Sequence, residues 1–364
     1  MQLVLTLLFF YLLIAINEGK GIYFIEDKNG QTFAEQISSD PNTAEQITSP
    51  IMELLHLNFD AKPTEKALRK KRSERASNYM SSLYEQIEQD SDTLDADFWY
   101  QADRIVSSTP YNVKYISNTA ELTFSLDDFV SDKELLLGAQ LLVYAQTAQP
   151  IRVKLVGASE SPELPSSLFG STATLTSQNP ASFNVTELLS RWIKRFVQPT
   201  LGIKFEAIDQ TLSSLSLDSF IVAAFRDKNS VPLSRHERRR VKRQVEPIKQ
   251  DPFTQAMHPN TECHKQGLYV DFAALKWKEW VIAPEGYAAY FCTGACSFPP
   301  HDKMNATSHA IVQTLIHTVR PNQTEAAKCA PRELGSMKIL FTDNNRNVVM
   351  KRYKDMIVLN CGCH

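Results

Sequence analysis

The first 262 residues of this 364-residue chain contain no cysteine. Beyond its N-terminus the chain also lacks any apolar run long enough to cross a bilayer as a helix. The strings Gly-x-Ser-x-Gly and His-Glu-x-x-His, which mark common serine hydrolases and zinc proteases, do not occur. These absences argue against an enzyme, and we predict no catalytic residue, no cofactor and no metal site.

A strong excess of one charge is missing too. The segment after residue 243 carries 13 Lys and Arg against 11 Asp and Glu, and the whole chain has a formal net charge of −2. Binding to nucleic acid depends on neutralising many phosphates with a dense basic surface. Neither part of the chain is therefore predicted to bind nucleic acid.

The N-terminus carries the one long apolar run, from Leu3 to Ile16. This run is too short to span a bilayer comfortably, and it lies where a secretory signal peptide lies. We predict a signal peptide over residues 1–19 with cleavage near Gly19 or Gly21; an uncleaved signal anchor is the alternative. The product is expected to be secreted and extracellular, without membrane insertion.

Cysteine is confined to the last third of the chain, at Cys263, Cys292, Cys296, Cys329, Cys361 and Cys363. A secreted protein passes through an oxidising compartment, where disulfides persist. The C-x3-C and C-x-C spacings are those of a cystine knot, and Gly294 fits a ring with little room for a side chain. Six cysteines allow fifteen pairings, so the spacing alone does not determine the connectivity. Of these the knot predicts Cys292–Cys361 and Cys296–Cys363 as the ring and Cys263–Cys329 as the bridge through it.

A basic run divides the chain. Arg240-Val-Lys242-Arg243 has the R-x-K-R form that furin-like convertases of the secretory pathway cleave. The polar, proline-containing linkers on both sides keep such a substrate exposed. We predict cleavage after Arg243, between a cysteine-free proregion (residues 20–243) and a mature segment (residues 244–364) whose knot covers residues 263–364. A second basic run, Arg69–Arg72, also fits the convertase pattern; an exposed helix end is the alternative.

The proregion is long enough to build its own core. Apolar residues at helical spacing predict amphipathic helices at Ile51–Leu57 and Tyr79–Ile87. A further helix is expected after Asn184, over Glu187–Val197. Strands are expected at residues 120–124, 136–145, 151–156, 201–207 and 219–225. We predict an α+β proregion with a β-sandwich-like core, and hypothesise that the apolar face of Ile51–Leu57 lies in a groove on the mature segment.

The mature segment is predicted to be rich in β-strands with one long helix. A strand is expected at 268–272, with Leu268, Val270 and Phe272 on one face and Tyr269 and Asp271 on the other. Two further strands are expected at 337–341 and 348–358, joined by a turn at 343–347. The helix is His309–Arg320, with Asn305 or Thr307 as N-cap and a wide apolar face. Long hairpins and one helix bury too little for a lone monomer, so we predict a dimer in which each helix docks on the other chain's hairpins.

Several stretches carry a family likeness. They are Trp277-Lys-Glu-Trp280 and the residues through Cys292, Cys296-Ser-Phe298-Pro299, residues 304–315, and the end Cys361-Gly-Cys363-His364. They resemble the bone morphogenetic protein branch of the transforming growth factor-β superfamily, and the order of signal, proregion and convertase site is similar to that of the family's precursors. The resemblance implies a secreted dimeric growth factor. Such ligands bridge type I and type II receptor serine/threonine kinases, which then phosphorylate Smad proteins.

The resemblance also implies roles for single residues. Trp277 and Trp280, with Phe298 and Pro299, match the surface that meets type I receptors; core packing is the alternative for two tryptophans spaced i, i+3. The patch that meets type II receptors is matched by Ala283, Lys338, Leu340 and Met350. Lys338 stands where the family usually has a small polar residue, which leaves type II affinity open.

Lys328 marks a departure from the family pattern. The family usually has two adjacent cysteines before Ala-Pro, and the first of them joins the two chains of the dimer. Here the sequence is Ala327-Lys328-Cys329, so a covalent dimer through this position is excluded. We expect a non-covalent homodimer, or a heterodimer with a related ligand. The rival function is a secreted cystine-knot antagonist, or a subunit that sequesters related ligands.

Three asparagines, Asn184, Asn305 and Asn322, begin N-x-[ST] sequons. Asn305 and Asn322 are expected as glycosylated surface sites, whereas a helix N-cap is the alternative for Asn184. Besides the receptors and the convertase, the cut proregion itself is an expected partner of the mature segment.

Overall fold

The computed structural model describes residues 22–28, 31–38, 73–89, 98–146, 150–159, 169–195, 199–208, 217–230, 262–273, 275, 277–297, 299 and 304–364. A hairpin of β1 (Ile22–Lys28) and β2 (Gln31–Ser38) belongs to one compact unit, and the other named elements belong to a second. The predicted signal peptide, the predicted helix Ile51–Leu57 and both basic runs lie outside the described residues.

The proregion part of the second unit begins with two helices, α4 (Glu74–Glu88) and α5 (Phe98–Gln101). It continues with β3 (Arg104–Ser108), β4 (Asn112–Ile116), β5 (Thr119–Ser125), the 3₁₀ helix η1 (Leu126–Asp128), β6 (Glu134–Ala145), β7 (Ile151–Ser159), β8 (Thr172–Leu175), β9 (Ala181–Asn184), α6 (Thr186–Arg195), β10 (Thr200–Ala207) and β11 (Leu217–Asp227). All five predicted strands and the helix predicted at Tyr79–Ile87 are confirmed. The helix predicted at 187–197 is present as α6, and residues 196–198 lie outside the described part of the chain.

The mature segment contributes β12 (His264–Gln266), β13 (Tyr269–Asp271), β14 (Val281–Ala283), β15 (Gly286–Ala288), β16 (Phe291–Thr293), α8 (Ser308–Val319), β17 (Cys329–Thr342) and β18 (Val348–Cys363). The predicted hairpin, its turn and the helix are confirmed. Thr307 is the N-cap, because its Oγ1 accepts a hydrogen bond from the backbone N–H of Ala310. The expected alternation is seen from residue 269 to residue 272, where Tyr269 and Asp271 are exposed, Val270 is half-buried and Phe272 is buried. Leu268 precedes β13 and is exposed, so it does not join Phe272 in the core.

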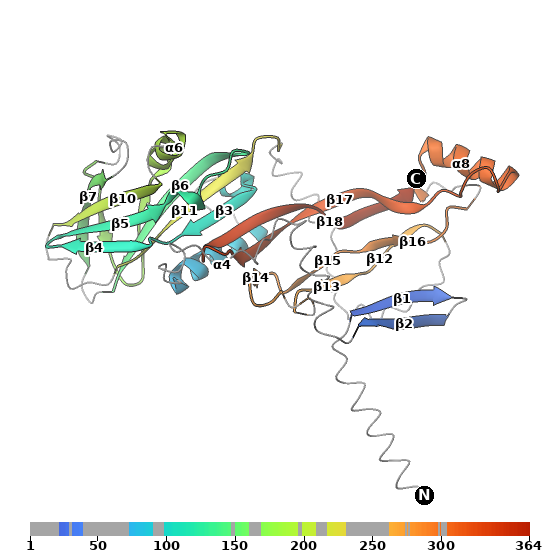
Figure 1. The fold of residues 1–364 in the computed structure, drawn as a ribbon, viewed down its shortest axis with the longest axis horizontal. Coiled ribbons are helices and arrows are strands. Elements are labelled where there is room, and N and C mark those ends of the chain that lie inside the picture. The colour runs from blue at the N-terminus through green and yellow to red at the C-terminus, as the bar shows by residue number, and fades with distance from the viewer. Residues whose placement is uncertain are drawn as a thin grey trace, which may run out of the picture. The chain divides into compact units, whose positions relative to one another are not determined.

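Two larger sheets organise this unit (Figure 1). One has five strands in the order β4-β5-β10-β7-β8, all from the proregion. The other has seven strands in the order β14-β17-β18-β3-β11-β6-β9 and is shared, because its first three strands belong to the mature segment and its last four to the proregion. Side chains of the two sheets meet where Phe183 of β9 lies 5.4 Å from Phe205 of β10, measured between ring centroids.

One row of residues in register crosses the shared sheet from the mature segment into the proregion. The row is Leu340, Met350, Ile105, Ala224 and Gly138, on β17, β18, β3, β11 and β6. An added Cβ at Gly138 would come within 2.7 Å of the ring of Phe98, so the row ends where α5 approaches the sheet. Burying a large apolar side chain contributes about 1.5–3 kcal/mol, so this row joins the two parts through a common core.

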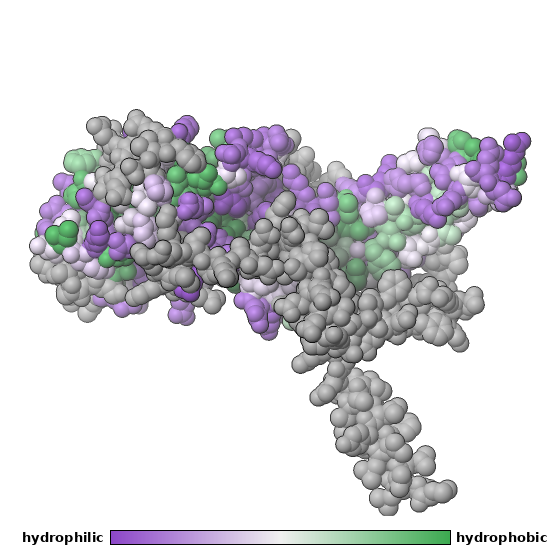
Figure 2. Space-filling model, in the orientation of Figure 1, coloured by the Kyte–Doolittle hydropathy of each residue, from purple (hydrophilic) through white to green (hydrophobic). Residues whose placement is uncertain are grey.

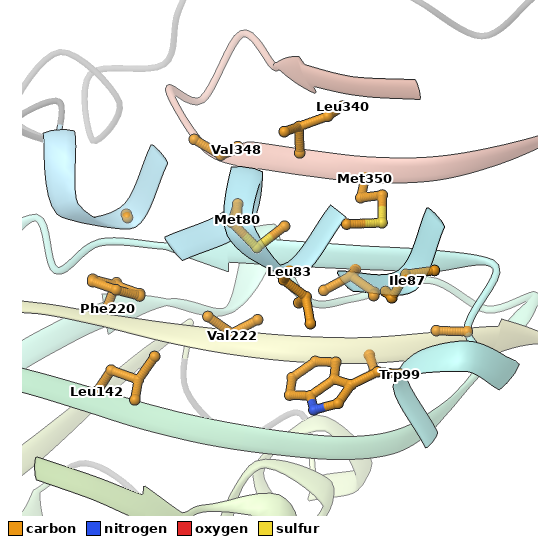
Figure 3. Packing of buried hydrophobic residues seen from close by; sticks show 14 of the residues in the cluster. Met80, Leu83, Ile87, Trp99, Leu142, Phe220, Val222, Leu340, Val348 and Met350 are labelled. Atoms are coloured by element: carbon orange, nitrogen blue, oxygen red, sulfur yellow. The ribbon is translucent and has the colours of Figure 1, made fainter. Parts of the chain in front are cut away.

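Helix α4 packs over this row. Its spacing of apolar residues turns Met80, Leu83 and Ile87 toward the sheet, where they are buried in one cluster with Leu340 and Met350. Figure 3 shows these three side chains of α4 between the mature strands and the side chains of Phe220, Val222 and Leu142 from the proregion. The helix starts at Ser73, whose Oγ accepts a hydrogen bond from the N–H of Ala76.

Candidate functional site

The three disulfides of the structure are Cys263–Cys329, Cys292–Cys361 and Cys296–Cys363, the pairing that the knot predicts. Gly294 has a φ of +104°, and an added Cβ would lie 2.1 Å from the carbonyl oxygen of Glu262. A side chain at this position is therefore excluded both by the backbone conformation and by the close chain. The sulfurs of Cys263, Cys296 and Cys363 lie within 4.8 Å of one another, but each belongs to a disulfide and offers no thiolate to a metal ion.

The two tryptophans expected at the type I receptor surface differ in exposure. Trp277 is 6% exposed and stacks on Phe272 with 5.6 Å between ring centroids. Trp280 is half-buried, and its ring centroid lies 5.3 Å from that of Trp277. The ring of Trp280 also meets the ring of Phe341 edge-on. Pro299 is exposed, and Phe298 lies outside the described residues. Trp280 thus exposes more aromatic surface to solvent than Trp277, whereas Trp277 is buried and packs against Trp280.

Of the four residues expected at the type II receptor patch, Leu340 and Met350 are buried in a cluster shared with the proregion. Leu340 is 0% exposed and Met350 is 1% exposed, both in the cluster beneath α4. Ala283 is partly buried against the same cluster, and Lys338 is half-buried on β17. Leu340 and Met350 are therefore inaccessible to solvent in this structure.

Polar contacts reinforce the join between the proregion and the mature segment. Arg352 of the mature segment forms an ion pair of 3.1 Å with Asp103, and Asn347 donates a hydrogen bond of 2.9 Å to Asp128. No sequence signal connected these residues, because each pair is more than 200 positions apart. Lys351 and Arg352 did not stand out in the sequence, because β18 also carries Lys354, Asp355 and Asn360.

Two cations, Arg104 from the proregion and Lys351 from the mature segment, lie next to each other where the two parts join. Lys351 is in register with Arg104, whose guanidinium forms an ion pair of 2.7 Å with Glu134. Burial lowers the pKa of the Lys351 ammonium below its ordinary value, with Glu134 opposing the shift and Arg104 adding to it. The Glu134 carboxylate thus interacts electrostatically with two positive side chains, one from each part.

Lys328 and α8 bear on dimer formation. The Lys328 backbone exchanges two hydrogen bonds of 2.9 Å with His364, and its ammonium lies 3.3 Å from the Glu325 carboxylate at the surface.

Helix α8 carries five exposed apolar residues: Ile311, Val312, Leu315, Ile316 and Val319, the last 68% exposed. Figure 2 shows apolar surface in green on this helix beside polar residues in purple.

The three sequons differ in geometry. Oδ1 of Asn184 accepts a hydrogen bond from the N–H of Thr186 at the start of α6, while the residue itself is exposed. Nδ2 of Asn305 donates to the carbonyl oxygen of Cys361 over 3.3 Å, so this side chain leans toward the knot. Asn322 is exposed in the turn after α8. Asn322 therefore offers the least hindered amide of the three.

The chain matches the family model of the transforming growth factor beta like domain over residues 262–363 and that of the TGF-beta propeptide over residues 28–242. Protein 60A of Drosophila virilis is 47% identical over 130 residues, which cover 35% of this chain and 29% of the relative. Bone morphogenetic protein 8A of Homo sapiens is 39% identical over 161 residues, which cover 41% of this chain and 40% of the relative. The matched regions thus span less than half of each of these relatives.

Among the described residues, none of the helices combines the length and apolarity that a membrane span requires. The two family models together account for most of the chain, and the second alone matches more than half of it. The chain belongs to the transforming growth factor-β superfamily, in its bone morphogenetic protein branch, as a growth factor joined to its propeptide.

Proposed function

We propose that this protein is a secreted precursor of a dimeric ligand that bridges type I and type II receptor serine/threonine kinases and activates Smad signalling. In this proposal residues 1–19 are the signal peptide, and a furin-like convertase cuts after Arg243. The cut separates the α+β proregion with its β-sandwich-like core from the mature knot. The observation that carries the proposal is the apolar patch of Leu340 and Met350 on the mature hairpin, covered by residues on the other side of the cut.

The covered patch gives the proregion a role of its own. Helix α4 and strand β3 occupy the face and the edge of the hairpin that a type II receptor would need. Both lie before Arg243, so the cut makes them separable from the mature segment. The proregion is then a competitor of the receptor, and its release exposes the patch.

The exposed apolar face of α8 supports the dimer. Five large apolar side chains on one short helix are more than a monomer usually leaves in water. A second copy that lays its hairpins on this helix would bury them in an isologous contact. Because Lys328 stands at the bridging position, dimerisation depends on concentration, and a related ligand could replace the second copy.

The test is to add purified, processed mature protein to cells that carry a Smad-responsive reporter. Activation that rises with dose supports the ligand. Lys338 in the type II patch and the missing bridge at Lys328 favour the rival function, an antagonist that sequesters relatives. Blockade of a related ligand without activation by the protein itself would therefore replace the first proposal with the second.

A further inference from the structure

Arg352 lies on β18 of the mature segment, and groups of the proregion surround its guanidinium. Nη1 lies 3.1 Å from Oδ1 of Asp103, and Nη2 donates to the carbonyl oxygens of Tyr100 and Ala102 over 3.2 and 3.5 Å. The side chains of Arg352 and Asp103 are 10% and 12% exposed. A charge buried this deeply needs an opposite charge and further acceptors, because an uncompensated buried charge is very costly.

Asp103 is itself fixed in place by the proregion. Its Oδ2 accepts hydrogen bonds from the N–H of Asp227 and the hydroxyl of Ser230, over 3.1 and 2.5 Å. Its backbone carbonyl accepts from the N–H of Arg352 over 2.7 Å. Asp103, Tyr100 and Ala102 all precede the predicted cut. When the proregion leaves, Arg352 therefore loses this carboxylate and both carbonyl oxygens together.

Arg352 shares a face with the candidate type II receptor patch. Lys338 is in register with Arg352, and Leu340 is in register with Met350 two residues away. Opposed residues of an antiparallel pair, and residues two apart on a strand, point to the same side of a sheet. Two cations therefore stand next to the apolar patch, and like charges directly opposite one another repel. Removal of the proregion leaves this face positively charged.

We propose that Arg352 is a carboxylate-binding site of the mature segment, filled by Asp103 in the precursor and by an acidic side chain of a type II receptor ectodomain after release. The proposal rests on the receptor-bridging function above. A guanidinium pairs most strongly with a carboxylate. A receptor that covered Leu340 and Met350 without supplying one would bury Arg352 uncompensated. Lys338 adds to this charge and so strengthens the selection of an acidic partner.

The experiment measures binding of type II receptor ectodomains to processed mature protein by surface plasmon resonance. The variants are Arg352→Ala and Arg352→Glu, with Arg332→Ala as control, because Arg332 is an exposed cation at the knot end of β17, away from Leu340. Arg352→Glu is expected to weaken binding by at least about tenfold, whereas Arg332→Ala changes it by less than about twofold. Disulfide mapping and binding to type I receptor ectodomains verify that each variant is folded.

Four results would overturn the inference. The first is Arg352→Ala that binds as tightly as the unaltered protein, and the second is unaltered protein that binds no type II ectodomain. The third is loss of retention on heparin by Arg352→Ala with unchanged receptor affinity, which would assign the site to a sulfated polysaccharide. The fourth is Smad activation that Arg352→Glu leaves unchanged, which would refute the site proposed at Arg352 and would not contradict the ligand function. Receptor binding that depends on Arg352 without any Smad activation would support the site at Arg352 and refute the ligand function.

Discussion

Asn347, in the turn of the mature hairpin, donates a hydrogen bond from its Nδ2 to Oδ1 of Asp128 in the proregion over 2.9 Å. Both side chains are buried. The other carboxylate oxygen of Asp128 accepts from the hydroxyl of Ser108, and the N–H of Asn347 donates to Asp343 within the turn. One amide therefore ties the tip of the mature hairpin to the proregion core.

Replacing this amide should loosen the precursor. Asn347→Ala removes a donor from a buried carboxylate, which is expected to lower the free energy of unfolding of the precursor by about 1–3 kcal/mol. Urea unfolding of the uncleaved precursor measures this change. The control is Asn360→Ala, at an exposed position of β18. Equal losses of stability in the two variants would contradict the role given to Asn347.

Met80 offers a test of the cover on the receptor patch. Its side chain is fully buried among residues of both parts of the chain. Met80→Ala is expected to cost about 2–5 kcal/mol of the stability of this core, and less proregion should then copurify with the mature segment after cleavage. Glu85→Ala, at an exposed position of the same helix, is the matched control. Unchanged copurification with Met80→Ala would show that α4 does not hold the two parts together.

Lys328 makes a prediction about covalent state. Processed mature protein should migrate as a single chain on a non-reducing gel, because all six cysteines lie in disulfides within the chain and Lys328 stands at the bridging position. Lys328→Cys should create a dimer band that disappears on reduction. A dimer band from the unaltered protein would refute the argument from Lys328.

Tyr353 makes a prediction about alkaline pH. Its hydroxyl is buried and has no hydrogen-bond partner within the described part of the chain, and burial raises its pKa above the ordinary value. The folded state keeps the phenol neutral, so its contribution to stability is complete below the unfolded pKa of about 10 and is lost as pH rises through the folded pKa.

Tyr353→Phe removes both the buried unpaired hydroxyl and the group whose pKa is raised. The variant is expected to be as stable as the original at neutral pH, or more stable by about 1 kcal/mol, since a buried unpaired hydroxyl is lost. Its advantage should grow between about pH 10 and pH 11. Urea unfolding at the two pH values measures this, with exposed Tyr269→Phe as control. An advantage that shrinks at high pH would contradict the assignment.

What the sequence could predict depended on local signals. The cysteine spacing, the glycine at 294 and the cap at Thr307 each act over a few residues, so the knot pairing and helix α8 were accessible. Spacing alone could not separate Trp277 from Trp280, because both fit the same i, i+3 pattern while only one is buried. Tertiary packing decides between them.

The pairing between β3 of the proregion and β18 of the mature segment could not be predicted from the sequence. Strand β3 reads Arg-Ile-Val-Ser-Ser and buries its last four residues, two of them serines, so it shows no alternation of apolar and polar positions. Its partner β18 lies more than 200 residues later in the chain, and no local rule specifies such a pairing. For the same reason Arg352 and Asp103 were not candidates for the site.

The central claim is that the proregion occupies the face of the mature hairpin that a type II receptor needs. Arg243→Ala should leave uncleaved precursor in the culture medium, and processed mature protein freed of its proregion provides the comparison. The most direct measurement is the affinity of both for type II receptor ectodomains. The precursor is expected to bind at least about tenfold more weakly, because little of it exposes Leu340 and Met350 at any moment. Equal affinity of precursor and mature protein would contradict the account.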